Sequence, residues 1–141
     1  MTKEYYLSQL GILSGRITFH SEQLYRLRRE KDAVSSRWGE SSGAVAFDAP
    51  YARLLEKIEA LEETLDSELE TRSRLQRQME ETIAGLPDEK MRLVLLYRYL
   101  EGKTFFEIGN LLYMDKSSAV RIHTKAMGLL VLPEDPLNIA A

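Results

Sequence analysis

Polar and basic side chains recur at helical spacing in the segment that follows Asp115. They alternate with Ala119, Ile122 and Ala126, so one face of a helix is apolar while the opposite face carries the polar groups. Lys and Arg can pair with phosphate or guanine, Ser and Thr can bond to base or phosphate, and Val can contact a thymine methyl group. The opposite face is therefore the candidate surface for double-stranded DNA. Its candidate residues are Lys116, Ser117, Val120, Arg121, Thr124 and Lys125.

A short helix is predicted just before this segment. Thr104 is a good N-cap, and Glu107 follows three residues later, as a capping box requires. We expect Lys103 and Thr104, which lie at the start of this helix, to contact phosphate groups of the DNA. The apolar stripe of this helix is predicted at Phe105, Ile108, Leu111 and Leu112.

A tight turn is predicted between the two helices. Gly109 is small where the helices must approach closely, and Tyr113-Met114 forms the turn, with Met114 pointing into the core. Asp115 then caps the second helix, whose buried face is expected to continue to Leu129 and Leu130. Two short helices joined in this way predict a helix-turn-helix, which lays its second helix in the DNA major groove.

Another helix is predicted from residue 87 to residue 101. Pro87 fits a first helical turn, and the acidic Asp88 and Glu89 favour the positive end of the helix dipole. Gly102 is a natural left-handed stop. The inward stripe of this helix is predicted at Met91, Val94, Leu95 and Leu100, with Tyr97 or Tyr99 at the edge.

Two much longer helices are predicted over residues 3–35 and 51–83, because apolar side chains recur there at spacings of three and four. Loop-forming residues separate them, so we expect an antiparallel hairpin. Its sparse seam has no third layer, which predicts a homodimer through this region. The seam residues are Tyr6, Leu10, Leu13, Ile17, Leu24, Leu27 and Val34 in the first helix, and Leu54, Ile58, Leu61, Leu65, Leu69, Leu75, Met79 and Ile83 in the second.

Polar residues interrupt this seam. We expect His20 to bond to a neighbour or to lean towards solvent, because one histidine cannot build a metal site. Arg72 falls at a heptad position, where a polar residue often sets register. In the connecting loop, Asp48 is a candidate cap for the second long helix, with Pro50 in its first turn. The loop is expected to pack down through Trp38, Val45 and Phe47.

The residues that support catalysis or metal binding are sparse. The chain has no cysteine, which excludes disulfides and thiolate metal sites, and its two histidines, His20 and His123, are far apart in sequence. It has no Gly-rich phosphate loop and no supported pair of nucleophile and base. The sequence therefore predicts neither an enzyme nor a cofactor.

Charge is unevenly distributed along the 141 residues, whose net charge is −3. Residues 87–130 carry seven basic and five acidic side chains, so the rest of the chain carries −5. A mildly basic module on an acidic body is compatible with DNA binding.

No apolar run approaches the roughly 20 residues that span a bilayer, and the N-terminus lacks the apolar core of a signal peptide. We therefore expect a cytoplasmic protein.

The predicted organisation is all-α. A helical hairpin over residues 1–84 precedes a three-helix DNA-binding domain over residues 85–132. A tail over residues 133–141 follows, and the sequence leaves open whether it is disordered or docks on a partner.

The segment from Leu86 to Leu130 resembles the region-four DNA-binding domain of bacterial sigma factors. Tyr113 stands where many helix-turn-helix turns have Gly. Gly109 stands where the family usually has Ala, and we expect this replacement to be harmless because small size is what matters. The resemblance rests on Leu86-Pro87, Arg92, Tyr97-Arg98-Tyr99, Gly102, Thr104 and Glu107-Ile108-Gly109.

Within that superfamily the chain is most similar to the RinA/ArpU-like regulators of phages and prophages of Gram-positive bacteria. The similarity lies in Arg98-Tyr99-Leu100, Gly102-Lys103-Thr104, Glu107-Ile108 and Arg121-Ile122-His123. This resemblance implies a sequence-specific DNA-binding regulator that activates late or packaging-related genes, in contact with RNA polymerase. The residues alone do not distinguish activation from repression.

Two alternatives stay open at this stage. A DNA-packaging protein, such as a small terminase-like subunit, also combines a helix-turn-helix with an oligomerising helical part. A ring of many subunits would favour packaging, whereas a dimer would favour the regulator. The second alternative is a protein-interaction module that keeps the fold without binding DNA.

Overall fold

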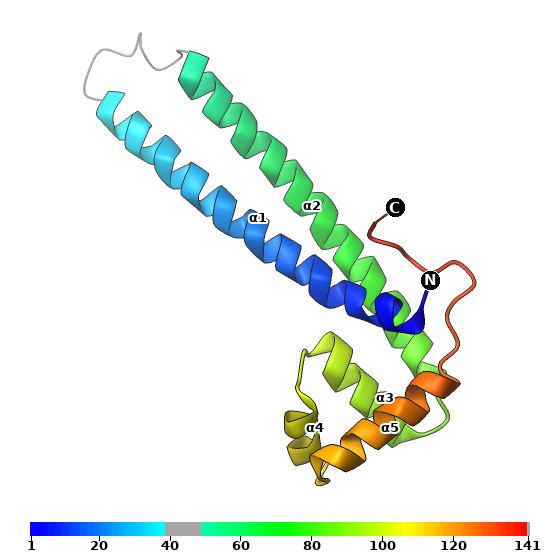
Figure 1. The fold of residues 1–141 in the computed structure, drawn as a ribbon. Coiled ribbons are helices and arrows are strands. Elements are labelled where there is room, and N and C mark those ends of the chain that lie inside the picture. The colour runs from blue at the N-terminus through cyan, green and yellow to red at the C-terminus, as the bar shows by residue number, and fades with distance from the viewer. Residues whose placement is uncertain (39–48, 141) are drawn as a thin grey trace. The chain divides into compact units, whose positions relative to one another are not determined.

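The computed structural model describes residues 1–38 and 49–140 of the chain. All regular structure in these ranges is helical, which confirms the predicted all-α fold (Figure 1). The expected cap at Asp48 and the expected packing of Trp38, Val45 and Phe47 fall on side chains outside this description. The elements are α1 (Lys3–Trp38), α2 (Ala49–Ala84), α3 (Glu89–Leu95), a π-helical turn η2 (Leu96–Leu100), α4 (Phe105–Leu111) and α5 (Lys116–Leu129).

Internal contacts divide the chain into two compact units. Residues 15–70 form the hairpin unit, and residues 1–14 together with 71–141 form the helix-turn-helix unit. The first turns of α1 and the last turns of α2 thus belong with the three short helices. The domain boundary expected at residue 84 stays a prediction, because contacts alone do not show which part folds independently. No helix among the described residues is long and apolar enough to span a membrane.

The hairpin unit is held together by a seam of aliphatic side chains. Among its described residues, His20 Nδ1 is hydrogen-bonded to Glu68 Oε1 at 2.7 Å, and Arg28 Nη2 forms an ion pair with Glu62 Oε1 at 3.3 Å. The expectation that His20 bonds to a neighbour is therefore confirmed. The buried members of the seam are Ile17, Leu24, Leu54, Ile58 and Leu65, whereas Leu27, Val34 and Leu61 are half-buried.

The prediction that Leu69 belongs to the buried seam is wrong. Its side chain is 41% exposed, whereas the neighbouring Glu68 is only 9% exposed. The reason is the polar His20 on the facing helix, whose imidazole is paired with the Glu68 carboxylate. An adjacent residue on a helix is rotated by about 100°, so the inward position of Glu68 turns Leu69 outward.

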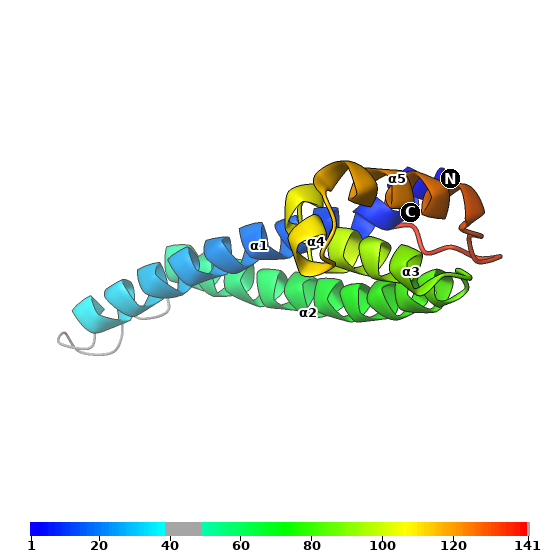
Figure 2. The same ribbon diagram turned by 90° about the horizontal axis from the view of Figure 1, so that it is seen from below.

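The core of the helix-turn-helix unit forms where α3 and α4 pack against α5 (Figures 1 and 2). Val94, Ile108 and Ala119, one from each helix, are fully buried at its centre. Partly buried side chains surround this centre, namely Tyr97, Phe105, Leu112, Met114 and Ile122. The inward position predicted for Met114 is therefore confirmed.

Two residues expected in this core are exposed instead. Leu111 is the last residue of α4, and the core position at this end of the helix is taken by Leu112. Leu129 is the last residue of α5; the chain then becomes extended at Leu130, whose side chain is buried. Both errors arise because the helices end there, so the helical period no longer decides which side chain is inside.

The helix expected over residues 87–101 starts later and is not uniform. The prediction that Pro87 lies in its first turn is wrong, because α3 begins at Glu89 with Asp88 as its N-cap. It starts as α3 and widens into the π-helical turn η2, in which the backbone N–H of Glu101 donates to the carbonyl of Leu96 at 3.2 Å. Gly102 follows with φ of +67°, as expected for a left-handed stop. Val94 and Leu95 are buried, whereas Met91 and Leu100 are half-buried.

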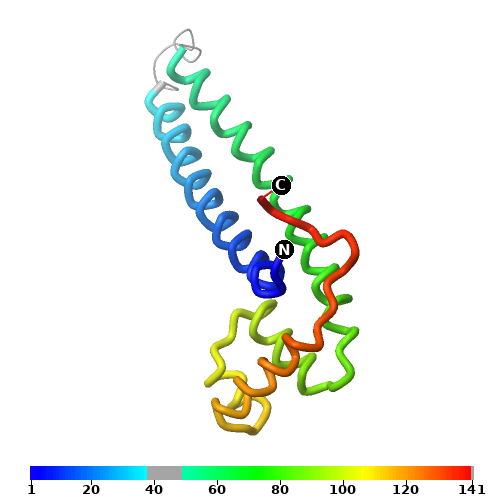
Figure 3. The backbone as a smooth tube through the Cα atoms, turned by 45° about the vertical axis from the view of Figure 1, so that its right-hand side comes forward, coloured from blue at the N-terminus to red at the C-terminus, as the bar shows by residue number. Residues whose placement is uncertain are grey.

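The tail does not extend away from the chain. After Leu130 it runs without regular structure and docks on residues from α1 and α2 that belong to the same unit (Figure 3). Lys3 contributes a further contact to this unit, since its Nζ donates to the carbonyl of Met127 at 2.9 Å. A cation at the C-terminal end of α5 is favourable for the helix dipole.

Candidate nucleic-acid interface

The first helix of the motif begins with the predicted capping box. Thr104 Oγ1 accepts from the backbone N–H of Glu107 at 3.1 Å, and Thr104 N–H donates to Glu107 Oε1 at 3.2 Å. These bonds with Thr104, the backbone one above all, hold the pKa of Glu107 below its usual value. The capping box therefore fixes where α4 starts and keeps a charged carboxylate there.

The turn between α4 and α5 is tight and strained at one residue. Tyr113 has φ of +58°, in the left-handed region, and its side chain is 97% exposed. The backbone N–H of Met114 donates to the carbonyl of Gly109 at 2.9 Å. A Cβ atom on Gly109 would lie 2.6 Å from the carbonyl oxygen of Met114. The prediction that residue 109 must be small where the helices approach is therefore confirmed, and in this chain even the methyl group of Ala would require the turn to shift.

The second helix starts at the predicted cap. Asp115 Oδ1 accepts from the backbone N–H of Ser118 at 3.0 Å, and hydrogen bonding with Ser118 holds the pKa of Asp115 below its usual value. Bonding to Ser117 and the charge of Arg121 lower this pKa further. The Asp115 carboxylate is thus charged, and its charge is satisfied at the helix start.

The structure exposes the residues expected to form the outer face of α5. Asp115 and four candidate residues line one shallow concavity, namely Lys116, Ser117, Val120 and Arg121. Thr124 and Lys125 are exposed one turn further along. Arg121 Nη2 donates to Ser118 Oγ at 3.2 Å, which holds its guanidinium along the helix, and Thr124 Oγ1 donates to the carbonyl of Val120 at 3.0 Å. The surface thus combines three cations, two hydroxyls and one small apolar side chain, namely Lys116, Arg121 and Lys125, Ser117 and Thr124, and Val120.

The two remaining candidates lie at the start of α4. The side chain of Thr104 is exposed but occupied by its capping box, while Lys103 is half-buried. Arg98 Nη1 donates to the carbonyl of Lys103 at 3.1 Å and fixes the backbone there. The exposed Phe106 on the first turn of α4 was not among the sequence candidates. Its position off the apolar stripe could have indicated an outward aromatic residue.

A cluster of aromatic and cationic groups contacts α5 on the side that faces η2 and α4. Tyr99 Oη lies 2.7 Å from His123 Nε2, and the rings of Phe105 and His123 meet edge to face, with centroids 5.1 Å apart. The guanidinium of Arg98 stacks 4.4 Å above the centroid of the Phe105 ring. Burial, and then the nearby Arg98 charge, lower the pKa of His123. His123 therefore packs against η2 and α4 rather than facing outward.

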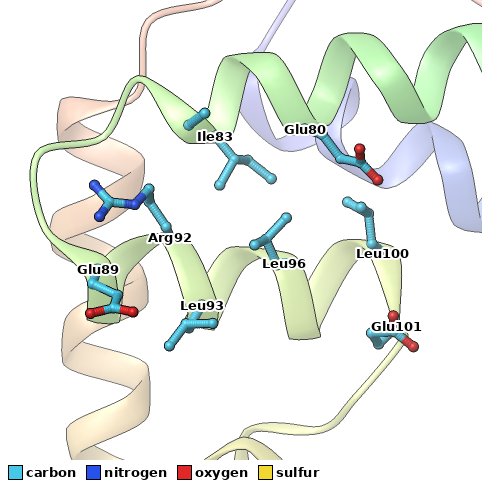
Figure 4. Close-up of a pocket in the computed structure, with 9 residues that line it drawn as sticks. Glu80, Ile83, Glu89, Arg92, Leu93, Leu96, Leu100 and Glu101 are labelled. Carbon is cyan, nitrogen blue, oxygen red and sulfur yellow. The ribbon is translucent and has the colours of Figure 1, made fainter.

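A second concavity lies between the end of α2 and the α3–η2 segment (Figure 4). Aliphatic side chains, among them Ile83, Leu96 and Leu100, point into it, and Glu80, Glu89 and Glu101 lie around it. Arg92 in its lining donates to the carbonyl of Leu86 at 2.5 Å. Within the described residues no group of three or more His, Cys, Asp or Glu side chains could hold a metal ion. This second concavity is thus lined by aliphatic side chains and has carboxylates around it.

Comparisons with protein families, with characterised proteins and with solved structures found no match for this chain. The functional argument therefore rests on the helical architecture and on the surface chemistry of α5. The resemblance to sigma factor region four stays an expectation drawn from the residues.

Proposed function

We propose that this chain is a sequence-specific double-stranded DNA-binding regulator whose helix α5 enters the major groove. The observation that carries the proposal is the exposed face with Lys116, Ser117, Val120 and Arg121, presented by a capped helix on a packed three-helix core. An α-helix fits the width of the major groove, and these side chains match both phosphate and base edges.

The roles of the candidate residues follow from their present partners. Lys116 and Arg121 are exposed cations that can bind phosphate or guanine. Val120 offers a methyl surface for thymine between them. The hydroxyl of Thr124 already donates to its own helix, so its remaining capacity is to accept. At α4, Lys103 supplies the phosphate contact, since Thr104 is engaged in capping.

Pairing of two copies would let the protein read two half-sites. The hairpin unit supports this part of the proposal because it leaves large apolar side chains uncovered. Leu55 and Leu69 are both exposed on α2, and their separation of two heptads puts them on one face. Phe19 and Tyr25 are more than half exposed on α1. A second copy that covered these side chains would be stabilised by their burial.

The biological setting of the proposal comes from the resemblance. A regulator of phage or prophage genes acts in the cytoplasm of the host cell, where its promoter DNA lies. Activation of late genes through RNA polymerase is the form that the resemblance favours. The surface of α5 supports DNA binding in either an activator or a repressor.

The test begins with selection of bound sequences from random DNA, followed by affinity measurements on the selected site. Arg121→Ala is expected to weaken binding by about 5- to 150-fold, the equivalent of about 1–3 kcal/mol for a base-contacting arginine. Lys116→Ala should weaken binding and reduce the salt dependence by about one phosphate contact.

Lys90→Ala is the matched control, because it removes one exposed positive charge from α3 in the same unit. It should change affinity only slightly. Undiminished binding by Arg121→Ala would contradict the assignment of α5 as the recognition helix. Absence of binding by the unmodified chain at low salt would exclude the DNA proposal and favour a protein-interaction module. A ring of many subunits would favour the packaging alternative.

A further inference from the structure

The C-terminal tail is held by two glutamine side chains. Gln78 Nε2 donates to the carbonyl of Asp135 at 3.0 Å, and Gln78 Oε1 accepts from the N–H of Leu137 at 2.9 Å. Gln9 repeats this pattern two residues further along: its Nε2 donates to the carbonyl of Leu137 at 2.9 Å, and its Oε1 accepts from the N–H of Ile139 at 2.8 Å. We refer to Gln9 and Gln78 as the tail clamp.

The tail clamp recognises backbone atoms rather than side chains. Each amide bonds the carbonyl of one tail residue and the N–H of the residue two positions later, as a neighbouring β-strand would do. Both amides are themselves fixed. Gln9 is fully buried and also donates to the carbonyl of Tyr6 at 3.3 Å, while Tyr6 Oη donates to Gln78 Oε1 at 2.8 Å. The clamp is thus a preorganised site for an extended peptide.

The segment that connects α5 to the clamped tail leaves apolar surface uncovered. Val131 is 80% exposed, and Leu129, at the end of α5, is more than half exposed. Pro133 in this segment has no N–H and cannot donate a hydrogen bond that would tie the segment to its own unit. Leu130 is buried and anchors the start of this segment in its own unit, while Leu132 and Pro133 after it are only half-buried. A crossing between two copies would therefore begin after Leu130.

We propose that two copies of the chain exchange their tails, so that the tail clamp of each copy takes residues 135–139 of the other. The clamp makes the same backbone hydrogen bonds to either tail, since nothing in them depends on the covalent connection. Exchange brings the two connecting segments past one another, where Val131 and Leu129 of each can be covered. Reciprocal exchange of one element is a low-cost route to a dimer. This contact does not depend on DNA binding.

The test uses the absence of cysteine in the chain. Tyr5 Oη donates to Asn138 Oδ1 at 3.0 Å, so residues 5 and 138 report on tail docking. Tyr5→Cys and Asn138→Cys are introduced into separate full-length chains of different mass. The two chains are mixed and treated with a short bis-maleimide cross-linker. Exchange should give a cross-linked heterodimer at least about tenfold faster than random collision, because docking raises the effective concentration of the two thiols.

The control mixture pairs Tyr5→Cys with Asn110→Cys, an exposed position on α4 that does not belong to the tail. It should react at the collision rate. Val131→Ser should slow cross-linking in the test mixture, because it removes apolar surface that exchange would cover while leaving the clamp intact. The proposal is overturned if the mixture reacts no faster than the control while a chain carrying both cysteines links efficiently to itself. Circular dichroism checks that each variant keeps its helical content.

Discussion

The hydroxyl of Tyr99 lies 2.7 Å from Nε2 of His123 and joins the π-helical turn η2 to the middle of α5. Burial lowers the pKa of this imidazole, and the Arg98 charge adds to the effect. Below pH 6.5, the ordinary pKa of histidine, the unfolded chain therefore binds a proton at residue 123 more readily than the folded chain does. The contribution of His123 to the free energy of unfolding should have its full value above pH 6.5 and should decline as the pH falls towards the lowered pKa. Thermal unfolding between pH 5 and 8 measures it.

His123→Gln is the matched variant, because it keeps a hydrogen-bonding side chain that does not titrate. The difference in stability between the two proteins should shrink as the pH falls below 6.5. A constant difference over the whole range would show that protonation of His123 is not coupled to folding.

The left-handed backbone at Tyr113 predicts a stabilising substitution. A non-glycine residue pays about 1–2 kcal/mol in this conformation, and the exposed ring has no packing to lose. Tyr113→Gly should therefore raise the free energy of unfolding by about 0.5–1 kcal/mol, after the extra entropy of glycine in the unfolded chain. Tyr113→Ala keeps the unfavourable backbone and should change little. Urea denaturation of the three proteins compares them directly, and equal gains from Gly and Ala would exclude backbone strain as the cause.

The close approach at Gly109 predicts the opposite effect. In Gly109→Ala the new methyl group would meet the carbonyl oxygen of Met114 at 2.6 Å, and the atom it meets is backbone. The turn must shift, which should lower the free energy of unfolding by about 1–3 kcal/mol. Gly128→Ala is the control, because its Cβ meets nothing within 4 Å, and it should be neutral or stabilising by up to about 1 kcal/mol. If both variants unfold alike, the helices do not approach at Gly109 as described.

The His20–Glu68 pair predicts a non-additive pair of substitutions in the hairpin unit. Glu68→Ala leaves a partly buried imidazole without its partner and should cost about 1–2 kcal/mol. Replacing both residues with Leu should restore or exceed the original stability, because it removes the two hydrogen-bonding partners together. Arg28→Ala breaks the exposed pair with Glu62 and should cost no more than about 1 kcal/mol. A double-mutant cycle by urea denaturation tests this; additive effects at His20 and Glu68 would contradict the coupling.

The starts of α4 and α5 could be predicted from sequence because their capping is local, whereas α3 begins after Pro87 without a side-chain cap. Thr104 and Asp115 each bond to a backbone N–H three residues later, so identity and spacing are sufficient. The exposed face of α5 followed from the helical period in the same way. The positions of Leu69 and Leu129 could not be predicted, because the first depends on a histidine across the seam and the second on where α5 ends.

Contacts between distant residues were beyond the reach of the sequence. Tyr99, which meets His123, lies in the π-helical turn η2, and no residue in Leu96–Leu100 marks such a turn. The tail clamp pairs Gln9 with Gln78, which belong to different helices and share no periodic pattern. The sequence left the fate of the tail open, and the structure docks it on its own chain.

The π-helical turn has a consequence for residue deletion. A helix rotates by about 100° per residue, so the number of residues in η2 sets which way the side chains at its end, up to Leu100, are directed. Deleting Arg98 would close the wide turn into an ordinary helix and swing the Tyr99 hydroxyl away from His123. The ring of Phe105 would lose its cation at the same time. The number of residues in this turn thus decides whether Tyr99 faces His123 and whether Arg98 faces Phe105.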